Sequence, residues 1–266
     1  MRRLLPINHR VLFVILTSGC GTGTWIATFE GIDLVKDGID SSRFSDGCSL
    51  QIDSLPVVIH QASVVNTAYS PIAQTTFNNT MFDAAYDVPV VLGQEEIIAY
   101  PYNRHSMTIA PGIATEFGEG MDPVFGANFD SVNGSIGLFG TLECGTDQVE
   151  LAWAFSQTID VICDYNYRVP KDGEAIAAYE LDPRPLFRMS SLDDEIETIA
   201  GQAIIDADAD GDGVVQLFEL SEVPLSTLDG YADDPTDRVD TLYQLIEYNT
   251  ERMILLDGTR CTPQIR

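Results

Sequence analysis

The spacing of apolar residues changes once along this chain of 266 residues, at Pro183-Arg184-Pro185. Before this break, apolar and polar residues alternate in short runs separated by turn residues, which is the period of a half-buried β-strand. After it, apolar residues recur every three to four positions, as in an amphipathic helix. The chain is therefore predicted to be mainly β, with a small α-helical region over residues 183–266.

The clearest strand signals lie on either side of Gly145-Thr146-Asp147 and predict a hairpin. Each of the two runs has one apolar face. The alternating residues are Ile136, Leu138, Leu142 and Cys144 before the turn, and Val149, Leu151, Trp153 and Phe155 after it. Many short strands with no helical pattern between them favour an antiparallel sandwich or an open barrel over residues 24–182.

The rest of the β region gives weaker signals. Residues 35–48 are rich in turn formers and predict a loop, and Pro56 within the extended run 48–65 predicts two strands or an edge strand. Residues 66–86 show little periodicity and predict a loop with at most one strand. Gly93-Gln94-Glu95-Glu96 predicts a turn.

Three helices are predicted after the break. The first starts near Ser191 and carries an apolar stripe as far as Ile204. The second starts at Leu217 and stops before Pro224. The third has Asp234 as its cap and Pro235 at its first position, and continues to Gly258.

Acidic residues recur at fixed spacing between the first two helices, in the sequence DADGDGVVQLFE at 208–219. Three aspartates occupy positions 1, 3 and 5, a glycine position 6 and a glutamate position 12, which is the EF-hand calcium pattern. Carboxylates two residues apart in a tight loop can converge on one point, and the glycine permits the turn. We expect Ca²⁺ to be held by Asp208, Asp210, Asp212, the carbonyl of Val214, a water on Gln216, and both oxygens of Glu219.

Aspartate and glycine are also ordinary turn formers, so an acidic surface loop that binds no ion is the alternative. The overall charge of the chain favours the first interpretation, a loop that binds a metal ion. The chain has 41 acidic and 14 basic residues, with a net charge of −27 and a pI near 4.1. Such a surface repels nucleic acid and anionic lipid, and it attracts divalent cations or basic ligands. The same charge also suits solubility in a salty or calcium-containing medium.

The N-terminus has the features of an export signal. Three arginines precede an apolar run at residues 11–16, and Thr17-Ser18-Gly19 leads to Cys20. The run is too short to span a bilayer, which takes about 20 residues. The Ser-Gly-Cys ending resembles a bacterial lipoprotein signal, which implies removal of residues 1–19, a lipid on Cys20 and a linker at 20–23. Plain secretion and a buried apolar N-terminal segment remain alternatives.

Four further cysteines suit two disulfides in an oxidising compartment, with three connectivities open. None of them lies in a C-x-x-C pair, which disfavours zinc or a thioredoxin-like site. The four are Cys48, Cys144, Cys163 and Cys261.

These features together resemble a group of bacterial cell-envelope lipoproteins that join a β-sandwich to one calcium loop of the form D-x-D-G-D-G-x-V-x-x-x-E-L. The likeness runs from Cys48 to Cys261 and includes Trp153 and Phe155 before Cys163. It continues through ELDPRPLFRMSSLDDE at 180–195, the loop, Tyr231, the helix from Pro235 and Gly258-Thr259-Arg260-Cys261. It implies the fold, the calcium site and the lipid anchor. Histidines that members carry before the loop and near the end are absent here, so it implies no transition metal.

The sequence therefore predicts an exported protein, lipid-anchored at the bacterial outer membrane or cell surface, or in the periplasm. A lone loop without a partner EF-hand predicts a structural ion rather than a switch. The alternative is a calcium-dependent adhesion module that presents residues 66–86 and 112–134 to a glycan or to an envelope protein.

Enzymatic activity is not expected. His60 and His105 are the histidines left after signal removal, and Ser135 lies in NGSIG, which lacks the first glycine of G-x-S-x-G. No H-E-x-x-H, Walker loop or Gly-rich dinucleotide turn occurs. An uncharacterised hydrolase that uses paired carboxylates is the remaining enzymatic alternative.

Overall fold

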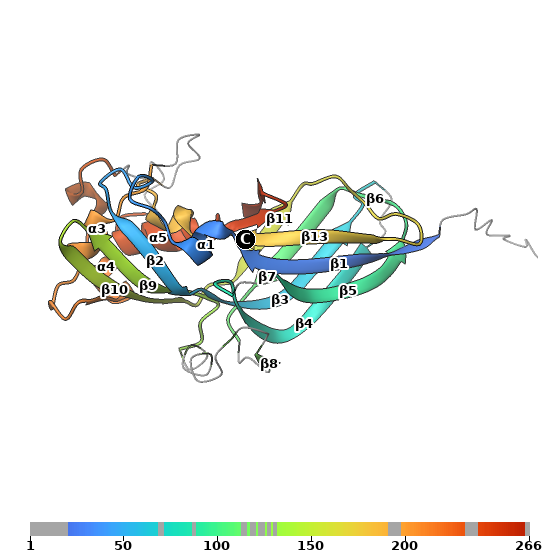
Figure 1. Ribbon diagram of the computed structural model, residues 1–266, viewed down its shortest axis with the longest axis horizontal. Coiled ribbons are helices and arrows are strands. Elements are labelled where there is room, and N and C mark those ends of the chain that lie inside the picture. Colours follow the sequence, from blue (N-terminus) through green and yellow to red (C-terminus); the bar gives the residue numbers. More distant parts are fainter. Residues whose placement is uncertain are drawn as a thin grey trace, which may run out of the picture.

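The computed structural model describes residues 21–68, 72–86, 89–112, 116–117, 121, 126, 129, 132–190, 198–231 and 239–263 (Figure 1). The protein is mainly β with a few short helices, as predicted. One sheet has five strands in the order β16-β15-β13-β1-β5. The strands are β1 (Thr22–Gly31), β5 (Val90–Ile98), β13 (Glu174–Leu181), β15 (Ile254–Leu256) and β16 (Thr259–Arg260).

A second, ten-stranded sheet curls against the first as a half-barrel (Figure 1). Its main path is β14-β10-β9-β3-β7-β11-β17, with β2 on β9, and β4 and β8 beyond β3. These strands are β2 (Ser49–Ser54), β3 (Pro56–Val65), β4 (Ile72–Asp83), β7 (Arg104–Ile109), β8 (Glu116–Phe117), β9 (Ile136–Cys144), β10 (Asp147–Phe155), β11 (Ile159–Cys163), β14 (Val214–Val215) and β17 (Thr262–Pro263). A small pair joins β6 (Pro101–Tyr102) to β12 (Tyr167–Arg168).

The helices are short, and α3, α4 and α5 gather beside β9 and β10 at one end of the molecule (Figure 1). Among the described residues, no helix has the length and apolar character needed to cross a membrane. The helical elements are α1 (Asp33–Asp37), η1 (Arg184–Phe187), α3 (Gln202–Ile205), α4 (Leu217–Leu220), η2 (Leu225–Thr227) and α5 (Leu242–Thr250).

The predicted hairpin is confirmed, because β9 and β10 pair from Ile136↔Phe155 to Cys144↔Asp147. Gly145 turns the chain with a φ of +65°, a backbone conformation that favours glycine. Pro56 also separates two strands as predicted, since β2 ends at Ser54 and β3 starts at Pro56.

Strands occupy both of the segments expected to be irregular, although the sequence allows for one strand within residues 66–86. Most of residues 66–86 form β4, which pairs with β3 from Pro56↔Asp83 to Val65↔Ile72. The expected turn at 93–96 lies inside β5, which pairs with β1 through a bulge at Ala27/Thr28. Since β5 is an edge strand with exposed polar side chains at Gln94, Glu95 and Glu96, it has no alternating pattern to reveal it.

The predicted helices are shorter than expected. Residues 198–200 are not helical, because Ile199 makes β-bridges to Phe44 and Arg188, and helix α3 begins at Gln202. Residues 191–197 and 232–238, which include the expected caps, lie outside the described residues. Helix α5 begins at Leu242, where the Thr241 hydroxyl accepts from the backbone of Gln244, and residues 239–241 before it are not helical.

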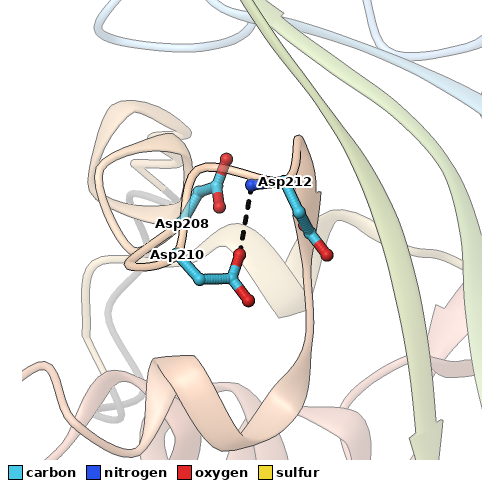
Figure 2. A group of neighbouring side chains, drawn as sticks. All are labelled: Asp208, Asp210 and Asp212. Carbon is cyan, nitrogen blue, oxygen red and sulfur yellow. Dashed lines mark hydrogen bonds between the residues drawn. The ribbon is translucent and has the colours of Figure 1, made fainter.

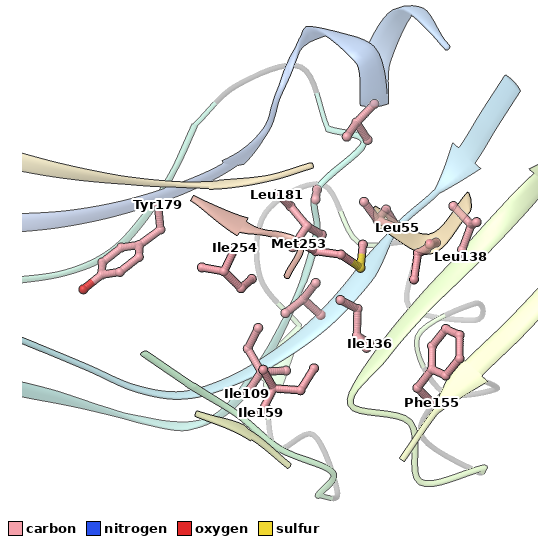
Figure 3. Packing of buried hydrophobic residues seen from close by; sticks show 14 of the residues in the cluster. Leu55, Ile109, Ile136, Leu138, Phe155, Ile159, Tyr179, Leu181, Met253 and Ile254 are labelled. Carbon is pink, nitrogen blue, oxygen red and sulfur yellow. The ribbon is translucent and has the colours of Figure 1, made fainter. Parts of the chain in front are cut away.

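Helix α5 also ends at Thr250, not at Gly258, because the chain continues as β15 and pairs with β13. Strands from beyond residue 183 therefore complete both sheets: β15 joins β13, β17 joins β11, and β14 joins β10. The core is continuous across the two predicted regions, with Met253 and Ile254 beside Leu181 and Ile136 (Figure 3).

Two disulfides tie these parts together, and they settle the connectivity as Cys48–Cys144 and Cys163–Cys261. The first joins the start of β2 to the end of β9, and the second joins β11 to the C-terminal segment. Their sequence separations, 96 and 98 residues, are nearly equal. Residues 1–19 and Cys20 lie outside the described residues.

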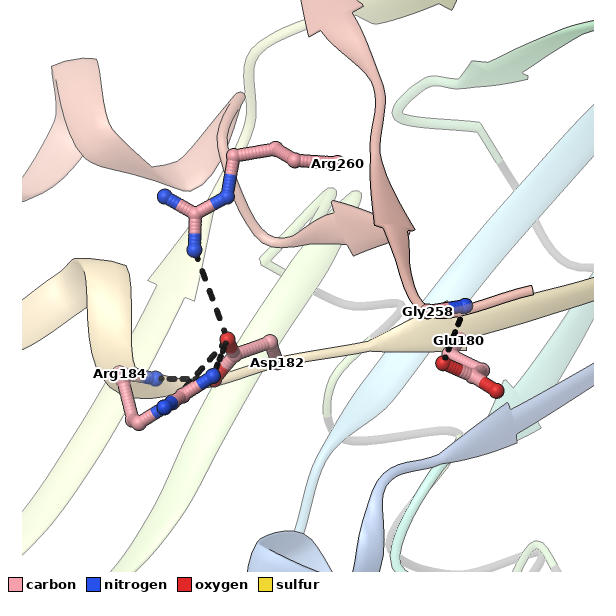
Figure 4. Close-up of polar contacts among 5 residues, drawn as sticks. All are labelled: Glu180, Asp182, Arg184, Gly258 and Arg260. Atoms are coloured by element: carbon pink, nitrogen blue, oxygen red, sulfur yellow. Dashed lines mark hydrogen bonds and ion pairs between the residues drawn. The ribbon is translucent and has the colours of Figure 1, made fainter. Parts of the chain in front are cut away.

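A buried acid holds the end of β13 to the elements that follow (Figure 4). The side chain of Asp182 is 0% exposed, and its Oδ2 lies 2.6 Å from Nη2 of Arg184 and 3.6 Å from Nη2 of Arg260. Its Oδ1 also accepts the backbone N–H of Arg184 at 3.0 Å. Asp182 therefore joins β13, η1 and the β15–β16 hairpin.

His105 on β7 is expected to make the protein less stable in acid. The residue is 0% exposed, and neither ring nitrogen has a hydrogen-bond partner in the described part of the chain. Burial lowers the pKa of His105 from 6.5 to about 4. Between these values the unfolded chain binds a proton that the folded protein does not, so stability falls as the pH falls through this window.

Replacing His105 by phenylalanine is therefore expected to remove part of the acid sensitivity. Between pH 7 and pH 4.5 the wild type should lose about 2 kcal/mol more of its unfolding free energy than this variant. Urea unfolding at the two pH values measures the difference. His60→Gln is the matched control, since His60 is partly exposed and contacts the carbonyl of Ala110. Equal pH slopes for wild type and His105→Phe would contradict the prediction.

Candidate metal centre

The segment 208–219, called the 208–219 loop below, begins shortly after α3, joins the edge of the ten-stranded sheet as β14 and ends within α4. Helix α3 leads directly into it, since Asp206 donates its N–H to Gln202 and Asp208 donates its N–H to Ile205. The loop thus has a helical turn on each side and a strand near its middle.

Three carboxylates converge at the tip of the 208–219 loop (Figure 2). One oxygen each from Asp208, Asp210 and Asp212 lies within 4.8 Å of the other two, so the group could hold a metal ion. Asp208 is half-buried and the other two are exposed. These are the residues predicted at loop positions 1, 3 and 5.

Local hydrogen bonds give the loop its shape. The carboxylate of Asp208 accepts the N–H groups of Gly211 at 2.9 Å and Gly213 at 3.0 Å, and that of Asp210 accepts the N–H of Asp212 at 3.1 Å. Gly213 has a φ of +82°, and a Cβ added there would meet no atom within 4 Å. Backbone conformation rather than crowding therefore accounts for glycine at this position.

Val214 adds a carbonyl to the same space. Strand β14 runs parallel to β10, with Glu150↔Val214 and Leu151↔Val215 as partners. The N–H of Glu150 bonds to the carbonyl of Gly213 at 2.8 Å, whereas the N–H of Val214 bonds to Oδ1 of Asp212 at 2.8 Å. Because the N–H and C=O of one strand residue point the same way, the Val214 carbonyl faces the aspartates.

Val215 is fully buried and attaches the loop to the core, as predicted. Gln216 is exposed at the N-terminus of α4, where its side chain is open to water. The apolar alternation places Trp153 on a strand but does not reveal its contact with the loop, in which Nε1 donates to the carbonyl of Val215 at 3.1 Å across 62 positions. No local signal marks such a contact, because it depends on β14 lying beside β10.

Glu219 is buried, with 3% of its surface exposed. Its Oε1 accepts the N–H of Ala209 at 3.1 Å, and its Oε2 accepts the N–H of Gln216 at 2.9 Å, so one carboxylate spans both sides of the loop. Within the described ranges no basic side chain forms an ion pair with it. The carboxylate oxygens of Glu219 do not belong to the group formed by Asp208, Asp210 and Asp212, whose oxygens lie within 4.8 Å of one another. A buried carboxylate is costly without a cation, so its chemistry fits a metal beside it.

The other candidate residues lie elsewhere. Ser135 is 0% exposed and its hydroxyl donates to the carbonyl of Phe155, so it is not placed as a nucleophile. Of the two candidate ligand-presenting loops, residues 66–86 are mostly β4. Residues 112–134 lie largely outside the described residues.

No protein-family model, curated protein or solved structure matches the chain. What the site can do therefore rests on its own geometry. Three clustered carboxylates, an inward carbonyl and a buried fourth carboxylate form an all-oxygen set, which suits a hard divalent cation rather than a thiophilic metal.

Proposed function

We propose that the protein is an exported calcium-binding protein in which one Ca²⁺ in the 208–219 loop is mainly structural. The observation that carries this proposal is the grouping of oxygens from Asp208, Asp210 and Asp212 within 4.8 Å. The Val214 carbonyl faces the same space, and Glu219 can supply a further carboxylate by a change of its side-chain rotamer. Ca²⁺ accepts six to eight oxygens in a flexible arrangement, whereas Mg²⁺ demands a near-ideal octahedron.

A structural rather than switching ion is supported by the surroundings of the loop. Calcium sensors open a pair of long helices to expose a groove. Here α3 and α4 have four residues each, and β14 is paired with β10 in the large sheet. An ion in this setting holds the helical end of the protein against the β core.

Export is supported by the two disulfides, because such bonds persist in oxidising compartments. Extracellular calcium modules bind with dissociation constants of about 10⁻⁴ to 10⁻³ M, which suffices where calcium is abundant. The signal at residues 1–19 and a lipid on Cys20 belong to the same proposal. The likeness to envelope lipoproteins stays a prediction.

Isothermal titration tests the proposal. The wild type is expected to bind about one Ca²⁺ per chain, and the double variant Asp208→Asn/Glu219→Gln is expected to bind none. Asp206→Asn/Glu222→Gln is the matched control, because it removes the same two charges from exposed residues that flank the loop. The control should titrate like the wild type.

Equal titrations of wild type and Asp208→Asn/Glu219→Gln would overturn the calcium site. Circular dichroism of each variant in chelator shows whether its fold is intact. At a calcium concentration 100 times the dissociation constant, the ion should also add about 2.7 kcal/mol to the stability of the wild type and of the control, and nothing to that of Asp208→Asn/Glu219→Gln.

A further inference from the structure

The entry to the 208–219 loop is held by a distant segment, residues 44–48, called the 44–48 clasp below. Ser45 donates its backbone N–H to the carbonyl of Ile199 at 2.8 Å and its hydroxyl to the same oxygen at 3.0 Å. Phe44 forms a parallel bridge with Ile199. The clasp therefore fixes the backbone just before α3.

Asp46, in the centre of the clasp, caps α3. Its Oδ2 accepts the N–H groups of Gly201 at 2.7 Å and Gln202 at 2.8 Å, which are among the donors that a helix start leaves unpaired. Helix α3 leads directly into Asp208, so the cap fixes the position of the first metal-ligating residue. Asp46 itself is a positioning residue, since its carboxylate is occupied by these backbone groups.

The Cys48–Cys144 disulfide fastens the clasp to the hairpin that holds the other side of the loop. Cys48 lies two residues after Asp46, and Cys144 ends β9, whose partner β10 pairs with β14. The entry backbone packs directly on this bond, because a Cβ added to Gly201 would lie 3.1 Å from Sγ of Cys48. Both flanks of the metal loop are thus attached to one disulfide-linked hairpin.

We propose that the Cys48–Cys144 disulfide, acting through Asp46, sets the affinity of the 208–219 loop for its cation, so that reduction of this bond weakens cation binding. The inference rests on the proposed function. A dithiol reductant supplies two electrons and two protons: the S–S bond breaks, Cys48 and Cys144 become thiols, and the reductant becomes a cyclic disulfide. Without the disulfide, the 44–48 clasp no longer holds α3 in place before the ion binds. Part of the binding free energy is then used to order α3, so the affinity falls.

The full-length oxidised protein offers a matched pair of variants. Cys48→Ser/Cys144→Ser and Cys163→Ser/Cys261→Ser open loops of nearly equal length, 96 and 98 residues, so they release similar chain entropy. Calcium titration is expected to show about a fivefold or larger rise in the dissociation constant for the first variant. The second should stay within about twofold of the wild type.

Substitution of Asp46 tests, with both disulfides intact, whether Asp46 carries the effect of the disulfide to the 208–219 loop. This test also replaces the first one if Cys48→Ser/Cys144→Ser does not fold. Asp46→Ala removes the cap and should raise the dissociation constant about fivefold, whereas Asp46→Asn keeps a capping oxygen and should restore the wild-type value within about twofold. Loss of affinity in both would indicate an effect of charge and would overturn the positioning role.

Linkage requires the reverse effect as well, since calcium must disfavour reduction of Cys48–Cys144 by the same factor. The protein is equilibrated, with calcium or with chelator, in buffers that contain reduced and oxidised dithiothreitol at fixed ratios. Free thiols are then alkylated, and mass spectrometry of the cysteine peptides gives the fraction of each disulfide that is reduced. Calcium should protect Cys48–Cys144 and leave Cys163–Cys261 unchanged. If the wild type binds calcium but the two cysteine variants bind it equally well, the role of the disulfide is overturned while the proposed calcium binding stands. If the wild type binds no calcium, the proposed function fails first.

Discussion

Replacing Trp153 by alanine is expected to lower the free energy of unfolding by about 3–5 kcal/mol, the largest effect of any substitution considered. The side chain is fully buried, and its ring packs 6.4 Å from that of Phe155 and 6.0 Å from that of Phe187, measured between centroids. The substitution leaves a cavity between the half-barrel and the 208–219 loop, and it removes the hydrogen bond to the Val215 carbonyl. Urea unfolding followed by far-UV circular dichroism measures the loss.

The other tryptophan provides the control for the hydrogen bond. Trp153 and Trp25 are both 0% exposed, but Nε1 of Trp25 has no hydrogen-bond partner among the described residues. Phenylalanine at either position removes similar ring volume, while Trp153→Phe also removes the hydrogen bond from Nε1 to the Val215 carbonyl. Trp153→Phe should therefore cost about 1 kcal/mol more than Trp25→Phe. Equal costs would show that the N–H of Trp153 does not hold the loop.

Replacing Asp182 by alanine is expected to lower the free energy of unfolding by about 3 kcal/mol. The substitution leaves Arg184 and Arg260 without their shared carboxylate, and it removes an acceptor for the backbone N–H of Arg184. Both arginine side chains are 31% exposed, which places the cost at the low end for a buried pair.

Asp164→Ala is the control for Asp182→Ala. Asp164 also pairs with an arginine, Arg104, at 3.0 Å, but the two side chains are 71% and 42% exposed. Exposed pairs contribute little, so this variant should stay within about 0.5 kcal/mol of the wild type. The urea midpoints of the two variants make the comparison. A cost below 1 kcal/mol for Asp182→Ala would contradict a role in joining β13 to the C-terminal hairpin.

The sequence predicts strands well where one face is buried and the other is open to solvent. The β9–β10 hairpin follows from its apolar alternation, and Pro56 marks the start of β3 because proline lacks the N–H of a ladder. Strand β5 is not predictable in this way. Its pairing with β1 supplies the hydrogen bonds, while Gln94 and Glu96 need no apolar face at an edge.

The helical end shows a different limit. Ile199 fits an apolar helical stripe, but tertiary bridges to Phe44 and Arg188 hold it extended, and such contacts override a weak local propensity. By contrast, the start of α5 was predictable from Thr241 and Gln244, the first and last residues of a capping box.

At the candidate metal centre, loop spacing predicts the cluster of aspartates because its residues lie within twelve positions of one another. The supports of the loop are not local, and they come from three separate segments. Asp46 lies between α1 and β2, Trp153 lies on β10, and Cys144 lies at the end of β9. A spacing pattern identifies an ion's ligands but not the residues that hold those ligands in place.

The parallel pairing of β1 with β13 also bears on the rate of folding. Thr24 lies beside Glu174 and Gly31 beside Leu181, so the inner strands of the five-stranded sheet come from distant parts of the chain. Chains with many such long-range pairings fold in milliseconds to seconds, because loop closure opposes the first contacts. During synthesis the backbone N–H and C=O groups along the β13 side of β1 stay unpaired until β13 has been made, so this strand edge is open to pairing with other chains until then.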